Sequence, residues 1–294
     1  MPLRVGYVRE HFSSPLLQYA AHDQNKTFTL VECPGGTGQL TSRLTNDQID
    51  VAIALTDALI AGIANGSKAY KLVGSYVSTP LNWAVITGAK SKYQSLAELE
   101  GTPIGISRVG SGSQTMAYVM ARQQGWATDT LRFKVNNDIR GLIDSVNDGS
   151  TSAFMWEWFT TKPFVDAGEV RFIGSVPTPW PSWLIAAHTS HVRAPSNELR
   201  AFLDALSTYV VSFDAPNNRA GPNVTFIKET FGYREEDIGA WLETVRYPKN
   251  CSSIPEKVIT DTLAALENAG VVNAPEGHQF DVKNFIDTTV VTLT

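Results

Sequence analysis

The order of its apolar segments constrains this chain more than any other feature. Through the first two thirds, short runs rich in Val, Ile, Phe or Tyr alternate with stretches of helical, 3.6-residue spacing. The apolar runs are residues 4–8, 28–33, 51–55, 71–77, 104–107, 131–135, 153–156 and 170–176. The spacing is clearest at residues 114–124 and 139–146. Nearly continuous apolar strands that alternate with helices predict an α/β fold, with mostly parallel sheets covered by helices.

After about Pro195 the alternation stops. Residues 197–211, 235–245 and 256–269 have helical spacing, and turn clusters at 215–218 and 274–277 separate helical stretches. A doubly wound domain would keep alternating. We therefore expect this helical tail to pack on the first sheet that the chain builds.

Two crossovers between two lobes would account for this order. The extended run 76–87 would lead out of the first lobe, and the Pro- and Trp-rich run 177–183 would lead back, because prolines disfavour helices and central strands. The predicted division is lobe 1 from residues 1–84, lobe 2 from 85–185, and a mostly helical return to lobe 1 from 186–294.

Charge and composition exclude several classes of partner. The 294 residues hold 24 Lys+Arg against 29 Asp+Glu, a formal charge of −5, so the chain lacks the basic footprint of a nucleic-acid or anionic-membrane binder. No run approaches the ~20 apolar residues that span a bilayer, and no leader-like segment precedes the first strand-like run. Two cysteines are too few for a disulfide framework. We expect a cytoplasmic protein with a small-molecule partner, and nothing in the sequence indicates an ABC permease partner.

In open α/β sheets, ligands bind where strand ends lead into helices. The most informative such turn holds Arg108 and the run Gly110, Ser111, Gly112 and Ser113, between a strand and a helix. Glycines let the backbone approach a ligand, helix amides attract anions, and Arg108 offers a donor fork for a carboxylate, sulfonate or phosphate. An ordinary turn with a Ser N-cap is the alternative. Neither a Walker A loop nor a dinucleotide fingerprint fits these residues.

Two more turns follow early strands. Gly35, Gly36 and Thr37 precede a predicted helix that ends near residue 46, and Thr56 and Asp57 follow the strand 51–55. Both turns offer amides and polar side chains to a ligand. The structural alternatives are a tight turn with a Thr cap and an Asp that stabilises a helix start.

The first strand ends in a compact polar and aromatic group. Arg9, Glu10, His11 and Phe12 place a cation, an anion, an imidazole and an aromatic ring within four residues. We interpret this group as a recognition loop. An ordinary polar loop is the alternative.

Aromatic residues accompany the remaining candidates. Glu157 lies between Trp156 and Trp158, and a carboxylate among aromatic rings suits an amine through charge and cation–π contact. The alternative is that the tryptophans pack in the core and Glu157 is solvated. Asn136 follows the strand 131–135, and Trp180 lies in the second crossover, where it would cover an apolar or ring portion of a ligand.

No catalytic or metal motif is found. Gly-x-Ser-x-Gly, His-Glu-x-x-His and Cys-x-x-Cys are absent, and His188 and His191 have no acidic third ligand nearby. A cleft that brings His11 and Cys33 together is the remaining catalytic alternative. We predict no metal and no cofactor.

Two segments carry a family resemblance. Residues 49–57, and residues 95–106 leading to 110–113, resemble type II periplasmic-binding proteins. The nearest groups are the aliphatic sulfonate, nitrate and taurine binders and the fungal thiamine-pyrimidine synthases, and the closest are fungal and bacterial proteins sharing the generic fold. The similarity covers the first ~190 residues by motif and the remainder by element order. It implies two α/β lobes joined by two hinge segments, with a ligand enclosed between them and a helical C-terminal region on lobe 1.

The resemblance also implies which residues face the ligand: the loop from Arg9, the turn 35–37, Thr56 with Asp57, and the helix start 111–113. Two features depart from the family pattern. The leader of the exported binders is missing, which puts a transport role in doubt, and the cysteine-rich motif of the synthases is absent.

The functional hypothesis is non-catalytic binding of a small anionic or zwitterionic organic molecule in an inter-lobe cleft, with hinge closure. Arg108, Ser111 and Ser113 would bind the acidic group, and Glu157 or Asp57 any amine. The alternatives are an enzyme acting on a pyrimidine-like or sulfonated metabolite, and the substrate-binding component of an ABC transporter. The sequence leaves the ligand and the oligomeric state open.

Overall fold

The computed structural model describes residues 1–190, 192–273 and 278–294, and the chain forms two compact units. Unit 1 comprises Met1–Thr79, Trp180–Leu263 and Pro275–Thr294, and unit 2 comprises Pro80–Pro179 and Ala264–Ala274. The predicted boundaries at 84/85 and 185/186 differ from this division by a few residues, and the prediction gave none of the C-terminal segment to the second unit. The predicted turn at 274–277 lies outside the described residues.

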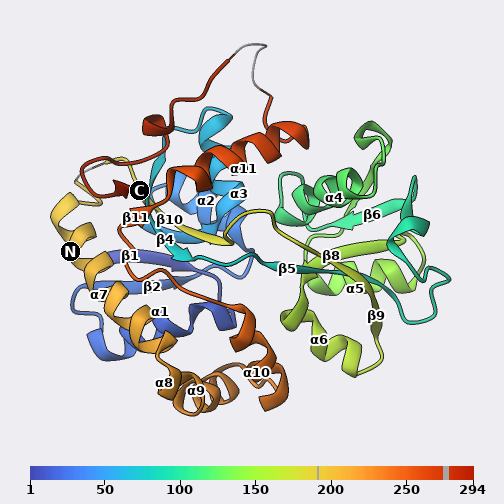
Figure 1. Cartoon of the computed structure of the whole chain (residues 1–294), viewed down its shortest axis with the longest axis horizontal. Coiled ribbons are helices and arrows are strands. Elements are labelled where there is room, and N and C mark those ends of the chain that lie inside the picture. Colours follow the sequence, from blue (N-terminus) through green and yellow to red (C-terminus); the bar gives the residue numbers. More distant parts are fainter. Residues whose placement is uncertain (191, 274–277) are drawn as a thin grey trace. The chain divides into compact units, whose positions relative to one another are not determined.

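Unit 1 is built on a five-stranded sheet of order β2-β1-β3-β10-β4 (Figure 1). The strands are β1 (Leu3–Tyr7), β2 (Phe28–Glu32), β3 (Val51–Leu55), β4 (Tyr70–Val77) and β10 (Trp183–His188). β1 is parallel to β2 and β3, whereas β10 is antiparallel to both β3 and β4. β10, which lies between β3 and the edge strand β4, therefore comes from a segment about a hundred residues after the other four strands.

Helices cover both faces of this sheet, because its central strands are apolar at nearly every position. The helices are α1 (Ser14–Asp23), α2 (Thr37–Thr45), α3 (Thr56–Ala64), α7 (Ser196–Asp214), α8 (Pro216–Arg219), α9 (Pro222–Phe231) and α10 (Glu235–Thr244). α1 packs beside α7 (Figure 1), while α2 and α3 pack against β3. α11 (Glu256–Asn268) begins in unit 1, and its last residues group with unit 2. The helical tail thus packs on the first sheet, as expected.

The segment after α10 lies against β4. The amide of Ser75 donates to the carbonyl of Cys251 at 2.9 Å, and the short strand β11 (Ser253–Ile254) pairs with β12 (Thr292–Leu293). At Gly74 a side chain would not fit, since a Cβ there would lie 2.2 Å from the Cys251 carbonyl oxygen. Further along β4, Leu72 forms a bridge with Ile286. The C-terminal segments therefore cover the edge strand.

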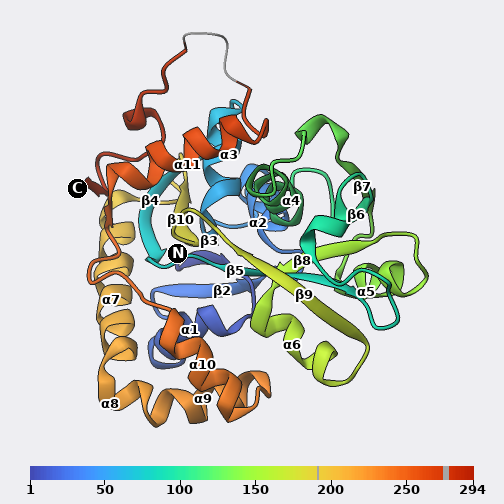
Figure 2. The same ribbon diagram turned by 45° about the vertical axis from the view of Figure 1, so that its right-hand side comes forward.

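Unit 2 contains a second five-stranded sheet, of order β7-β6-β8-β5-β9. The strands are β5 (Asn82–Gly88), β6 (Pro103–Ile106), β7 (Arg132–Val135), β8 (Ala153–Glu157) and β9 (Val170–Pro177), and the helices are α4 (Gly112–Gln123), α5 (Ile139–Asn147) and α6 (Trp158–Asp166). β6 is parallel to β7 and β8, whereas β5 is antiparallel to β8 and β9. The long strands β5 and β9 run side by side (Figure 2).

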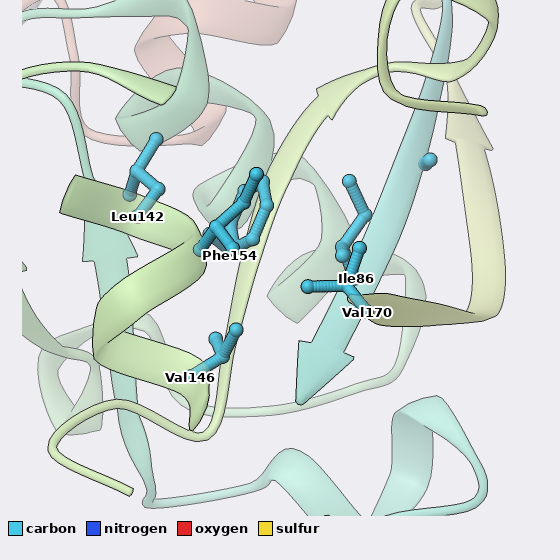
Figure 3. Packing of buried hydrophobic residues seen from close by; sticks show 7 residues of the cluster. Ile86, Leu142, Val146, Phe154 and Val170 are labelled. Atoms are coloured by element: carbon cyan, nitrogen blue, oxygen red, sulfur yellow. The ribbon is translucent and has the colours of Figure 1, made fainter. Parts of the chain in front are cut away.

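A cluster of buried apolar side chains joins this sheet to α5. Ile86 of β5, Phe154 of β8 and Val170 of β9 lie with Leu142 and Val146 of α5 (Figure 3). Aromatic side chains from α6 and β9 pack against the edge of the cluster. This core joins α5 to three strands of the unit 2 sheet.

The eight predicted strands all form, and the α/β prediction is confirmed. The two five-stranded sheets are mixed rather than mostly parallel, because β10 and β5 each pair antiparallel with both of their neighbours. The second half of the predicted crossover run 76–87 lies in β5, and β10 begins at the last residue of the predicted run 177–183; both are hydrogen-bonded strands inside the two sheets. α9 was not predicted. In the part of the chain that the structure describes, no helix is both long and apolar enough to cross a membrane.

Candidate functional site

Four of the predicted site segments meet at one edge of the unit 1 sheet. Parallel pairing brings the carboxyl ends of β1, β2 and β3 to this edge, and the antiparallel β10 begins there, with Trp183 opposite Leu55. The segments that leave or enter the sheet at this edge are 9–12, 35–37, 56–57 and the residues around Trp180. The sequence-based grouping of these residues is therefore matched by the topology.

Most polar groups of the turn 35–37 have a structural partner. The Gly35 amide donates to Gln39 Oε1 at 2.7 Å, and Gly36 has a positive φ of 70° that suits glycine. The Thr37 hydroxyl accepts from the Leu55 amide at 3.2 Å, which ties the start of α2 to the end of β3. The structure thus gives these residues the role of a tight turn, while their contact with a ligand stays a prediction.

Asp57, by contrast, is buried in the first turn of α3 with polar atoms left over. Its side chain is 3% exposed and that of Thr56 is 0% exposed. Asp57 Oδ2 and Thr56 Oγ1 lack a close hydrogen-bond partner among the described residues. Burial raises the pKa of the Asp57 carboxyl to about 6, although the amides of Asp57 and Ala58 and the side chain of Trp180 act to lower it.

His11 and Phe12 lie in an aromatic cluster rather than in an open loop. The His11 ring centroid is 4.5 Å from that of Phe12, 4.6 Å from Trp241 and 5.3 Å from Tyr233. Burial lowers the pKa of His11 to about 3, so the imidazole is neutral near pH 7. Its contacts are those of a packed aromatic residue.

Two buried tyrosines fix the backbone of this loop. The hydroxyls of Tyr76, on β4, and Tyr247, after α10, both donate to the Phe12 carbonyl, at 2.8 and 2.7 Å. Arg9 is exposed, donates to the Thr230 carbonyl at 3.1 Å, and its guanidinium carbon lies 5.8 Å from the centre of the Phe231 ring. Glu10 is half-buried beside it. The C-terminal helices thus position the first predicted recognition loop.

Unit 2 presents a corresponding edge, where β6, β7 and β8 end. Ser111 is the N-cap of α4 and accepts from the Gln114 amide, and its hydroxyl lies 2.9 Å from that of Ser113. The Ser113 hydroxyl also accepts from the Ser107 amide at 3.2 Å. Gly110, with a φ of 74°, allows the tight turn that precedes them.

The N-terminus of α4, including Gly112, therefore lies beside a pair of buried hydroxyls and next to Arg108. The Arg108 side chain is half-buried, and burial lowers the pKa of its guanidinium from the ordinary value. An arginine pKa is high enough that the group stays protonated. This edge suits an anion, because it combines one positive charge, two hydroxyls and the N-terminus of the 12-residue helix α4.

Asn136 leaves β7 at the same edge. Its amide donates to the Ile106 carbonyl at 2.8 Å, and its side-chain Oδ1 is buried without a hydrogen-bond partner in the described ranges. A Cβ on Gly105 would lie 3.2 Å from that Oδ1. The glycine therefore leaves room for the Asn136 amide group beside β6.

At the end of β8 two side chains differ in role. Trp156 packs against the unit 2 core cluster, which matches the core alternative, and its contact with a ligand stays a prediction. Glu157 is not solvated: it is 5% exposed and caps α6, with Oε2 accepting from the Thr160 amide at 2.7 Å. Burial raises the pKa of Glu157 to about 7, against the lowering effect of the Thr160 and Phe159 amides.

The surroundings of Cys33 and His188 bear on the catalytic and metal-binding alternatives. Cys33 is buried, its Sγ accepts from the Arg43 guanidinium at 3.4 Å, and desolvation raises the pKa of the thiol, which opposes thiolate formation. His188 Nε2 lies 2.8 Å from Asp47 Oδ1, and His191 is outside the described residues. In the described part of the chain, no group of three His, Cys, Asp or Glu residues could hold a metal.

Sequence reasoning missed the side chains that support the site from a distance. Trp241, Tyr247 and Tyr76 contact the His11–Phe12 loop, yet they lie 64 to 235 residues from it. No local spacing connects such residues. Only the helical pattern of residues 235–245 indicated that an apolar face was available there.

Comparison with known proteins gives a consistent answer. A family model described as Ca3427-like PBP matches residues 83–176. The solved structure of the conserved Candida albicans CA3427 gene product, described as defining a family with the generic periplasmic-binding-protein fold, is 31% identical. It has a TM-score of 0.87, with 100% of this chain and 98% of that chain covered.

More distant structures share the fold. The alkanesulfonate-binding protein SsuA from Xanthomonas axonopodis pv. citri, bound to MOPS, is 16% identical with a TM-score of 0.76, covering 100% of this chain and 98% of that chain. The periplasmic aliphatic sulphonate binding protein SsuA from Escherichia coli is 14% identical with a TM-score of 0.70, covering 100% and 93%. No curated protein matches the chain.

Proposed function

Because the chain belongs to the Ca3427-like family of proteins with the generic periplasmic-binding-protein fold, we propose that it binds a small anionic or zwitterionic organic molecule without catalysing a reaction. The observation that carries this proposal is the edge of unit 2 where Arg108 lies beside the Ser111–Ser113 hydroxyl pair and the N-terminus of α4. Such an arrangement offers donors and positive potential to a carboxylate or sulfonate.

Several structural neighbours support the choice of ligand class. Two carry printed names that describe binding of alkanesulfonates or aliphatic sulphonates, and one of them holds MOPS, a sulfonate. Sulfonates and carboxylates both present an anionic oxygen group that a guanidinium and helix amides recognise. We therefore propose a sulfonate or carboxylate group as the part of the ligand that unit 2 binds.

Calorimetric titration with butane-1-sulfonate and butanoate tests this proposal. The Arg108→Ala protein is expected to bind each anion at least ~10-fold more weakly than the wild type, because a charge-assisted hydrogen bond is lost. Arg122→Ala is the matched control, since Arg122 is an exposed arginine near the other end of α4. Equal affinities for the wild type and Arg108→Ala would contradict the assignment of Arg108.

We further propose that the ligand contacts residues of both units and that binding favours a closed conformation. A ligand can shift such an equilibrium only if it binds the closed state more tightly than the open one. Small-angle X-ray scattering is expected to give a smaller radius of gyration on saturation with a ligand identified by native mass spectrometry. An unchanged radius at saturation would contradict closure.

Two proposals for the cellular location compete. Our sequence prediction is a cytoplasmic binder with no sign of a permease partner in the sequence, whereas several neighbours are described as periplasmic or as components of ABC import systems. Those descriptions favour, as a second candidate function, the substrate-binding component of an importer. Fractionation of cells that express the protein from its own locus, followed by a test for co-purifying permease, separates the two proposals.

A further inference from the structure

The Asp57 carboxylate interacts with nearby backbone amides, but its Oδ2 atom has no close hydrogen-bond partner in the described residues. The backbone amides of Asp57 and Ala58, in the first turn of α3, lower the pKa of the carboxyl and so act on its charged form. Oδ2 is buried and has no close hydrogen bond, and the adjacent Thr56 Oγ1 is in the same condition. A role in stabilising the start of α3 therefore does not account for Asp57 Oδ2 or Thr56 Oγ1, which have no hydrogen-bond partner among the described residues.

Positive charge is missing where it would stabilise Asp57. Within the described residues, Asp57 forms no ion pair with Lys, Arg or His, unlike the similarly buried Asp50, which pairs with Arg4 at 2.6 Å. A buried ionised carboxylate without a cation is destabilised unless hydrogen bonds replace its lost hydration. A cation brought by a ligand would remove that cost.

Aromatic side chains surround the same end of β3. The side chain of Trp180 interacts with Asp57, and Trp183 pairs across the sheet with Leu55, the residue before Thr56. The rings of Trp183 and Phe12 are 5.9 Å apart. The Trp180 contact is a side-chain hydrogen bond, and aromatic rings beside a carboxylate suit an organic cation, which can also interact with a ring face.

We propose that Asp57 and Thr56 form a subsite of unit 1 for a primary ammonium group or a similar N–H-bearing organic cation. The ammonium donates to Asp57 Oδ2 and to Thr56 Oγ1, and the neighbouring tryptophans provide the aromatic surface. Glu157, the other candidate for an amine, already uses Oε2 to cap α6. This inference rests on the proposed function and narrows it, because a ligand with both groups is a zwitterion.

A matched pair of probes tests the subsite. In butane-1-sulfonate a methyl group replaces the ammonium of 3-aminopropane-1-sulfonate, and both compounds carry the same sulfonate. The wild type is expected to bind the amino compound at least ~10-fold more tightly, since its ammonium forms a charge-assisted hydrogen bond that the methyl group cannot form. In Asp57→Asn the preference disappears while the affinity for butane-1-sulfonate stays within about twofold.

The controls separate this inference from the proposed function. Asp204→Asn, an exposed acid on α7, is expected to leave both affinities unchanged. Arg108→Ala weakens both probes equally if the proposed function holds. Retained butane-1-sulfonate binding shows that Asp57→Asn is folded. Equal wild-type affinity for the two probes, or an unaltered preference in Asp57→Asn, overturns the subsite and leaves the anion site standing.

If the wild type binds neither sulfonate, the proposed function fails and propylammonium alone tests the subsite. Its titration is followed by tryptophan fluorescence, because Trp180 interacts with Asp57. A saturable change in the wild type that is absent in Asp57→Asn supports the ammonium subsite. A wild-type signal that does not respond to propylammonium overturns it.

Discussion

A single side chain at the end of β8 combines a structural and an electrostatic role. Glu157 accepts from the Thr160 amide and so begins α6, which favours its charged form. Burial has the larger and opposite effect, and the pKa of Glu157 rises to about 7. Near neutral pH this residue is therefore partly protonated while it still caps the helix. A small change of pH alters the charge at the unit 2 edge.

The unfolding free energy depends on pH because Glu157 binds its proton more tightly in the folded protein than in the unfolded chain. In the unfolded chain Glu157 titrates near 4.5, whereas in the folded protein its pKa is about 7. Its stabilising contribution is complete below pH 4.5 and is lost as the pH rises through 7. Glu157→Gln keeps an oxygen for the cap but cannot ionise. Relative to this variant, the wild type should lose about 2–3 kcal/mol of unfolding free energy between pH 4.5 and 8.

Urea unfolding of both proteins across this pH range measures the difference. Glu100→Gln, which changes an exposed acid of unit 2, is expected to show the wild-type profile. If the wild-type and Glu157→Gln stabilities change with pH in parallel, the raised pKa of Glu157 is contradicted.

At the level of elements, glycines mark where segments approach each other closely. Gly74 on β4 faces the Cys251 carbonyl, whereas Gly239 on α10 has no atom within 4 Å of its added Cβ. Replacing glycine by alanine should therefore change the stability in opposite directions at Gly74, which lies under a covering segment, and at Gly239, which has free space around it.

We expect Gly74→Ala to destabilise the protein by about 1–3 kcal/mol, because β4 and the covering segment must separate. Gly239→Ala should stabilise it by about 0.5–1 kcal/mol through helix propensity. Thermal and urea unfolding of the two variants give the comparison. A neutral Gly74→Ala would mean that the 250–254 segment is not held against β4.

The same elements show what the sequence could predict. Apolar runs identified β1, β2, β3 and β4 and their unit 2 counterparts, because strands buried on both faces need apolar residues throughout. The rule that ligands bind beyond strand carboxyl ends then singled out the turns with Arg108 and Asp57, and in the structure these turns do follow strand ends, while their contact with a ligand stays a prediction. β5 and β10 were harder, since Pro- and Trp-rich flanks made them look like connections. The tyrosines that hold the Phe12 carbonyl gave no signal, because their contacts depend on tertiary packing.

At the scale of the whole molecule, each unit has its own sheet and its own core. Leu203 on α7 and Leu142 on α5 are both fully buried, one in each unit. Contacts are concentrated within the units, so a defect in one core should raise local opening mainly in that unit.

Leu203→Ala and Leu142→Ala test this independence, and each should cost about 2–5 kcal/mol. Hydrogen exchange followed by mass spectrometry should show faster exchange in β1–β4 and β10 for the first variant. The second should affect β5–β9 instead. Acceleration of both sheets by either variant would indicate one cooperative unit of unfolding.

The origin of β10 determines the order in which the chain can fold during synthesis. The unit 1 sheet lacks the strand between β3 and β4 until residue 188 has been made, whereas every strand of the unit 2 sheet is present by residue 177. At about 5–20 residues per second, the ribosome needs roughly 5–20 seconds to pass from residue 79 to residue 188. During that interval β2, β1 and β3 can pair with one another, whereas β4 has no partner strand in the sheet until β10 has been made.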